Sequence, residues 1–136
     1  CGDLGFSSED RTENIRRAGE VAKLLFESGH MVICTFISPI ARDRAVVRAL
    51  VPEGRFVEIH VDCAIEVCIN RDPNGLYRNA LKGEIKDFTG ISSNYEPPAA
   101  PELTVRTDQE DADRIVGTLI RWLVEKGLVP ALAPVA

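Results

Sequence analysis

One short apolar run constrains the fold of this sequence more than any other feature. Residues 31–36 are Met-Val-Ile-Cys-Thr-Phe, with Gly29 before the run and Pro39 after it. Such a run is too short for a buried helix, and its lack of polar alternation is typical of a strand covered on both faces. We therefore expect a mostly parallel β-sheet with helices packed on both sides.

Helical patterns alternate with further strand patterns along the chain. Residues 7–29 repeat apolar side chains at helical spacing, start at Ser7 and Asp10 in a capping-box-like arrangement, and stop at Gly29. Additional helices are predicted at 40–51, 64–70, 76–83 and 109–126, and additional strands at 55–61 and 103–105. This alternation predicts an α/β fold of three layers, α/β/α, with crossover connections between parallel strands.

Composition narrows the class of protein. The hydrophobic fraction of 45% is that of a soluble globular domain, and the net charge of -5 argues against a nucleic-acid binder. No apolar stretch approaches the length of a membrane span. The cysteines form no Cys-x-x-Cys pair and have no histidine at metal-ligand spacing, so Cys34 and Cys63 are expected to pack as small apolar side chains. We expect a cytoplasmic protein without a protein-held metal ion.

The start of the first predicted helix is unusually basic. Arg11, Arg16 and Arg17 lie in its first turns, where the helix dipole normally favours acidic side chains. A bound anion would explain this placement. On composition alone, a solvated basic face paired with Glu9 and Glu13 is the more ordinary explanation.

Two further segments carry residues suited to a ligand. Residues 36–39 (Phe-Ile-Ser-Pro) lie at the carboxyl end of a predicted strand, where ligands of parallel sheets bind. A plain Ser-Pro turn is the alternative. Residues 82–91 form a charged segment with glycines near both ends, as in many lids, and Phe88 there would either pack on the protein or stack on a base.

These segments, together with two others, resemble one family. The five motifs are Phe-Ser-x-x-Asp-Arg-x-Glu-Asn-Ile-Arg-Arg (6–17), Phe-Ile-Ser-Pro (36–39), Arg-Asp-Pro-x-Gly-Leu-Tyr (71–77), Gly-Glu-Ile-Lys-x-Phe-Thr-Gly-Ile (83–91) and Tyr-Glu-Pro-Pro with Ala-Pro-Glu (95–102). In order and spacing they resemble the motifs of adenylylsulfate (APS) kinases over residues 2 to about 126. The resemblance implies a P-loop nucleoside triphosphate hydrolase-like fold.

The resemblance also implies an activity and a substrate site. APS kinases transfer the γ-phosphate of ATP to the 3′-hydroxyl of adenosine 5′-phosphosulfate, giving PAPS and ADP, with Mg²⁺ as cofactor. The implied APS-binding residues are Phe6 and Phe88, which would stack on adenine, Arg11 and Asn14 on the phosphosulfate and ribose side, the backbone of Ile37 and Ser38, and Asp87.

The remaining implied residues concern ATP and the transfer step. The residues implied on the ATP side are Arg71, Asn74, Thr107 and Asp108. The family often has lysine at the position of Asn74, so a charge contact from there is missing in this sequence. The resemblance implies that Lys86, with Lys82 beside it, stabilises the transferring phosphoryl group. Bacterial members are described with a phosphoserine at the position of Ser38, although direct transfer does not require one.

The sequence departs from the family at its beginning. It contains no Gly-x-x-x-x-Gly-Lys-Ser/Thr loop and no Asp-Gly-Asp-Asn segment, and we expect both upstream of Cys1 in a longer protein. Residues 1–129 would then be the kinase domain without its N-terminal part and without catalysis of its own. Residues 76–95 would be its mobile lid and residues 130–136 a C-terminal tail.

The resemblance finally implies partners. An ATP sulfurylase domain or subunit and a second copy in a homodimer are expected, and neither nucleic acid nor a membrane. The alternative function is a catalytically inactive APS kinase-like domain that binds APS or PAPS as an allosteric module of ATP sulfurylase. The missing phosphate-binding loop would fit that alternative.

Overall fold

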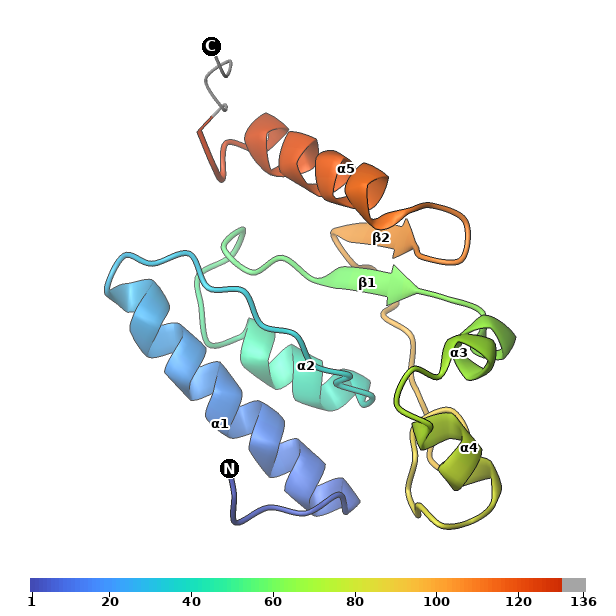
Figure 1. Cartoon of the computed structure of the whole chain (residues 1–136). Coiled ribbons are helices and arrows are strands. Elements are labelled where there is room, and N and C mark those ends of the chain that lie inside the picture. The colour runs from blue at the N-terminus through green and yellow to red at the C-terminus, as the bar shows by residue number, and fades with distance from the viewer. Residues whose placement is uncertain (131–136) are drawn as a thin grey trace.

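The computed structural model describes residues 1–130, in which a small parallel sheet lies between helices (Figure 1). The elements are α1 Ser8–Glu27, α2 Ala41–Arg48, β1 Ile59–Asp62, α3 Ile65–Arg71, α4 Leu76–Leu81, β2 Leu103–Arg106 and α5 Ala112–Glu125. In Figure 1, α5 lies on one side of the strands and α1 with α2 on the other. The predicted order of helices is confirmed, and the predicted tail lies outside the described residues from residue 131 on.

Helix α1 begins where the sequence predicts. The Ser7 hydroxyl accepts a hydrogen bond from the Asp10 backbone N–H at 3.1 Å, which satisfies one of the free donors of a helix start. The Asp10 carboxylate accepts from the Gly5 N–H at 3.1 Å, so the second contact of the capping box goes to a residue before the cap. Gly29 follows the helix with a φ of 89°, which glycine adopts without a Cβ clash.

Strands β1 and β2 are parallel, so their carboxyl ends lie at one edge of the sheet. The register pairs Asp62 with Arg106 at that edge. The Thr107 N–H and hydroxyl both donate to the Asp62 carbonyl oxygen, at 3.0 Å and 3.3 Å. The strands predicted at 55–61 and 103–105 are confirmed, although the first begins later than predicted.

The strand predicted at 31–36 is wrong. This segment has no regular secondary structure, and no backbone hydrogen bond within the described residues ties it to another segment. Ile33 is 83% exposed and Phe36 is exposed as well. A strand needs a neighbour whose N–H and C=O groups pair with its own, and residues 1–130 provide none beside this run. The expected burial of Cys34 is wrong for the same reason, since the thiol is exposed.

The apolar core of the described part is small. Its buried apolar residues are Ile15, Ala80, Val105 and Ile115, which belong to α1, α4, β2 and α5. No helix within residues 1–130 combines the length and the apolar composition that crossing a membrane requires.

Helices α1 and α2 pack closely because α1 carries a glycine where they meet. A Cβ atom added to Gly19 would lie 2.8 Å from Val47 Cγ2 and 3.1 Å from Leu50 Cδ1. Nearby, the Thr12 hydroxyl donates to the carboxylate of Asp43 at 2.8 Å, and Asp43 is buried. A buried carboxylate is tolerated when it is hydrogen-bonded, so this contact fixes how the two helices lie against each other.

We expect Gly19→Ala to lower the free energy of unfolding by about 1 kcal/mol. Overpacking costs about 1–3 kcal/mol, and the gain in helix propensity of about 1 kcal/mol offsets only part of it. Gly117→Ala in α5 is the matched control, because the nearest atom to its added Cβ is Arg121 Nη1 at 4.0 Å. This control should gain about 0.5–1 kcal/mol in urea unfolding. Equal stabilisation of both variants would contradict close packing at Gly19.

Candidate functional site

Ser38 and Asp87 are the non-glycine residues with a left-handed backbone in the described part of the chain. Their φ angles are 41° and 54°, a conformation that costs a residue with a Cβ atom about 1–2 kcal/mol. Such strain clusters at functional sites. The carbonyl oxygen of each residue accepts a hydrogen bond from an arginine, from Arg44 to Ser38 at 2.7 Å and from Arg11 to Asp87 at 2.8 Å.

Arg11 joins the start of α1 to the loop that follows α4. Besides Asp87, it donates from Nε to the Phe6 carbonyl oxygen at 3.0 Å and from Nη1 to Thr89 Oγ1 at 3.2 Å. These bonds occupy only some of the donors of a guanidinium, and the remaining N–H groups are available to an anion. Asn14 follows at i+3 on the same side of α1 and is half-buried. The site thus has donors at one end of α1.

The two aromatic residues assigned to base stacking lie on the segments that Arg11 connects. The Phe6 ring is 77% exposed, and the Arg11 guanidinium carbon lies 5.9 Å from its centroid, within cation–π range. Phe88 is half-buried and packs edge-to-face on Tyr77, with ring centroids 5.1 Å apart. One aromatic face is therefore open to a ligand, and the other ring is held by a neighbour.

The predicted lid contains a compact turn just after Asp87. The Phe88 N–H donates to Ser92 Oγ at 3.0 Å, and the Phe88 carbonyl oxygen accepts from the N–H groups of Ile91, Ser92 and Ser93. Lys86 precedes the turn and is exposed, as is Lys82, and neither makes an ion pair within residues 1–130. Both ammonium groups are therefore free to meet a phosphate.

The motif at 95–98 docks on the loop at 36–39. Ile37 in this loop is exposed, while Pro39 is buried and its carbonyl oxygen accepts from the Glu96 N–H at 2.8 Å. Tyr95, next to Glu96, stacks on His60 of β1 with centroids 6.2 Å apart. The loop at 36–39 is thus held against the sheet by residues far away in the sequence.

The residues assigned to the ATP side are only partly brought together. Arg71, at the end of α3, donates to the Thr107 carbonyl oxygen at 2.6 Å, and Asp108 follows Thr107 as an exposed residue at the carboxyl end of β2. Asn74 is exposed in the turn between α3 and α4, and among residues 1–130 it makes no hydrogen bond with these three. Arg71, Thr107 and Asp108 therefore form one cluster without Asn74.

Sequence reasoning missed Arg44, which supports the site through its hydrogen bond to the Ser38 carbonyl oxygen. The sequence feature that could have indicated Arg44 is its i, i+4 spacing to Arg48, which places both arginines on one face of α2. Both are half-buried on that face, whereas Arg42 is exposed. Arg48 hydrogen-bonds Glu102 at 2.6 Å and 2.8 Å and thereby lowers the pKa of that carboxyl from 4.5 to about 2. Glu102 is consequently ionised throughout the neutral range.

One family model and two curated proteins are similar to this chain over most of its length. The family model described as adenylylsulphate kinase matches residues 1–106. A curated adenylyl-sulfate kinase of Shewanella amazonensis is 54% identical over 131 residues, which cover 96% of this chain and 66% of that protein. The bifunctional enzyme NodQ of Azospirillum brasilense is 50% identical over 129 residues, which cover 95% of this chain and 21% of NodQ.

A solved structure shows the same arrangement of elements. The APS kinase CysC of Mycobacterium tuberculosis, in complex with AMPPNP and APS, matches with a TM-score of 0.84 and 42% identity over 90% of this chain and 71% of that one. The predicted fold class, an α/β fold of the P-loop nucleotide-binding type, is thereby confirmed. The chain spans 63% to 66% of the length of three curated adenylyl-sulfate kinases that it matches.

Proposed function

The chain belongs to the adenylylsulphate kinase family, and we propose that the complete protein transfers the γ-phosphate of ATP to the 3′-hydroxyl of APS. The products are PAPS and ADP. The observation that carries the proposal is the hydrogen-bonded cluster of Phe6, Arg11 and Asp87. Because Arg11 joins an exposed aromatic ring to the loop that carries Phe88, the cluster offers a stacking surface beside free guanidinium donors.

Each part of APS has a candidate partner in this site. We assign its adenine to the space between Phe6 and Phe88, and its phosphosulfate and ribose to the free donors of Arg11 and to Asn14. The backbone of Ile37 and Ser38 would line the other side of the pocket. Residues 76–95 would act as a lid, and closure of this lid over APS would exclude water and protect ATP from hydrolysis.

ATP would bind at the cluster of Arg71, Thr107 and Asp108, with Thr107 and Asp108 next to its base. The hydrogen bond from Arg71 to Thr107 supports this assignment, because it fixes the backbone at the carboxyl end of β2. Lys86 would approach the transferring phosphoryl group and stabilise its charge. The 3′-hydroxyl oxygen would bond to the γ-phosphorus and give up its proton to a base or to water, while the bond from the γ-phosphorus to the bridging oxygen breaks and that oxygen leaves with ADP. The transfer therefore needs no covalent step at Ser38.

Mg²⁺ is proposed to enter with ATP. The described residues contain no group of three or more His, Cys, Asp or Glu that could hold a metal ion. Magnesium commonly takes most of its ligands from nucleotide phosphates and water. The ion would bind as part of the MgATP substrate.

Partners are proposed from the relatives and the expected chemistry. NodQ, which is described as bifunctional, contains a region similar to this chain within a much longer protein. We propose an ATP sulfurylase domain or subunit as the partner, since that enzyme class supplies APS. A homodimer and a cytoplasmic location are further proposals.

The direct test is PAPS formation by the complete protein. With APS and MgATP we expect PAPS and ADP in equal amounts, measured by ion-pair chromatography. The 136-residue sequence has no Gly-x-x-x-x-Gly-Lys-Ser/Thr loop, so the same residues expressed alone are the expected inactive control. Tight APS or PAPS binding by the complete protein without any product would favour the allosteric module instead.

Phe88→Ala tests the stacking assignment. Loss of one base-stacking contact should weaken APS binding by about 1–3 kcal/mol, measured by calorimetry on the complete protein. Phe56→Ala is the matched control, because Phe56 is another half-buried phenylalanine whose ring packs on Arg48, 4.7 Å from the guanidinium carbon. Equal APS affinity in the two variants would show that Phe88 does not stack on APS.

Arg11→Ala tests the anion-binding assignment. It should weaken APS binding more than ATP binding, because the Arg11 guanidinium contacts Phe6 and Asp87 on the proposed APS side, whereas Arg71 contacts Thr107 on the proposed ATP side. Arg16→Ala is the control, since Arg16 lies on the same helix but pairs with Glu13 at 2.7 Å. Equal losses for APS and ATP in Arg11→Ala would indicate a purely structural arginine.

A further inference from the structure

The loop at 36–39 needs an external restraint to keep its shape. Ser38 has a φ of 41° and precedes Pro39. A residue before proline favours β or polyproline backbone, and a left-handed backbone is unfavourable for serine in any context. The local sequence therefore opposes the conformation observed, so contacts from elsewhere in the chain must hold it.

Arg44 supplies this restraint from the first turn of α2. Its Nη1 donates to the Ser38 carbonyl oxygen at 2.7 Å and its Nη2 to the Glu96 carbonyl oxygen at 2.7 Å. Its Nε lies 2.8 Å from Glu58 Oε1 in an ion pair, with the two side chains 12% and 17% exposed. The planar guanidinium thus fixes three groups from different segments at once, in surroundings where hydrogen bonds are strong.

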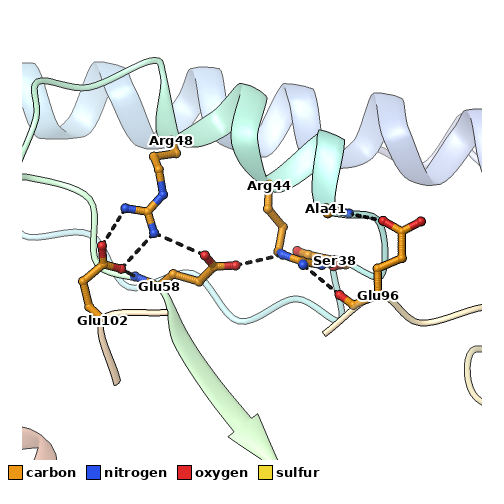
Figure 2. A network of polar contacts seen from close by, with 7 residues as sticks. All are labelled: Ser38, Ala41, Arg44, Arg48, Glu58, Glu96 and Glu102. Carbon is orange, nitrogen blue, oxygen red and sulfur yellow. Dashed lines mark hydrogen bonds and ion pairs between the residues drawn. The ribbon is translucent and has the colours of Figure 1, made fainter. Parts of the chain in front are cut away.

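Two of the three partners of Arg44, Glu96 and Glu58, are themselves anchored, as Figure 2 shows. The Glu96 carboxylate accepts from the Ala41 N–H at 2.7 Å, at the start of α2. The Glu58 N–H donates to Glu102 at 2.6 Å, and Glu102 pairs with Arg48. Glu58 Oε1 has no aligned hydrogen-bond donor within residues 1–130 and forms the ion pair with Arg44, while Glu58 Oε2 accepts from Arg48 Nη2 at 3.2 Å.

We propose that Arg44 is a positioning residue for APS, which it holds through the backbone of Ile37 and Ser38. This inference rests on the proposed function, because it assumes that these two residues line the APS pocket. The Arg44 side chain is only 12% exposed and its guanidinium contacts Ser38, Glu96 and Glu58, so Arg44 acts through the loop. A displacement of about 1 Å at such a loop is enough to weaken binding strongly.

Arg44→Gln and Arg48→Gln form a matched pair of variants in the complete protein. Both remove an arginine from the same helix face and from the same carboxylate, Glu58, but only Arg44 contacts Ser38. Calorimetry gives the Kd for APS and for an ATP analogue, steady-state kinetics gives the KM for each substrate, and thermal unfolding gives the Tm.

We expect Arg44→Gln to raise the Kd and KM for APS by about tenfold or more, with values for ATP within about twofold. The two variants should lower the Tm by similar amounts. Arg48→Gln should nevertheless leave the Kd and KM for APS within about twofold of wild type. Arg44→Lys keeps the charge beside Glu58 but cannot bridge both carbonyl oxygens. It should bind APS better than Arg44→Gln, and it provides the measurement if Arg44→Gln fails to fold.

Two results would overturn the inference while leaving the proposed function intact. One is an equal change in APS affinity in the Arg44 and Arg48 variants, and the other is an equal change for APS and ATP in Arg44→Gln. Absence of APS binding by the wild-type protein would instead overturn the proposed function and the inference with it.

Discussion

A guanidinium that donates to carbonyl oxygens of two segments fixes the distance between them, and this constraint occurs twice in the structure. Arg44 links Ser38 to Glu96, and Arg11 links Phe6 to Asp87. In both cases one of the carbonyls belongs to a residue with a left-handed backbone. The strain of the two loops is therefore offset by charge-assisted hydrogen bonds from arginines outside the loops, from Arg44 for Ser38 and from Arg11 for Asp87.

The two arginines lie on α1 and α2, so the packing of these helices determines how the loops are placed. Gly19 allows the close approach, and the buried Asp43 with Thr12 fixes it. The loop of Ser38 is carried by α2 and the cluster of Phe6 by α1. A pocket between the two loops would therefore keep its shape only while the helices remain in register.

The sequence predicted most of the elements and the family but not the supporting contacts. The capped start of α1 at Ser7 and the two parallel strands follow from local sequence patterns. The family model covers residues 1–106, as the five motifs suggest. The run at 31–36 was predicted as a strand because its apolar pattern is clear, yet pairing depends on a neighbour that no local pattern reveals. Arg44 was missed because its i, i+4 spacing to Arg48 indicates a shared helix face but does not reveal the carbonyl partners Ser38 and Glu96.

Protection of amide hydrogens from exchange tests most directly whether the two arginine-held loops form one APS site. The measurement compares residues 36–39 and 86–90 of the complete protein with and without APS, and with an ATP analogue alone. The account predicts that APS slows exchange in both segments together, while the ATP analogue alone slows neither and β1 changes in neither case. Protection of only one segment, or of neither, would contradict a shared site.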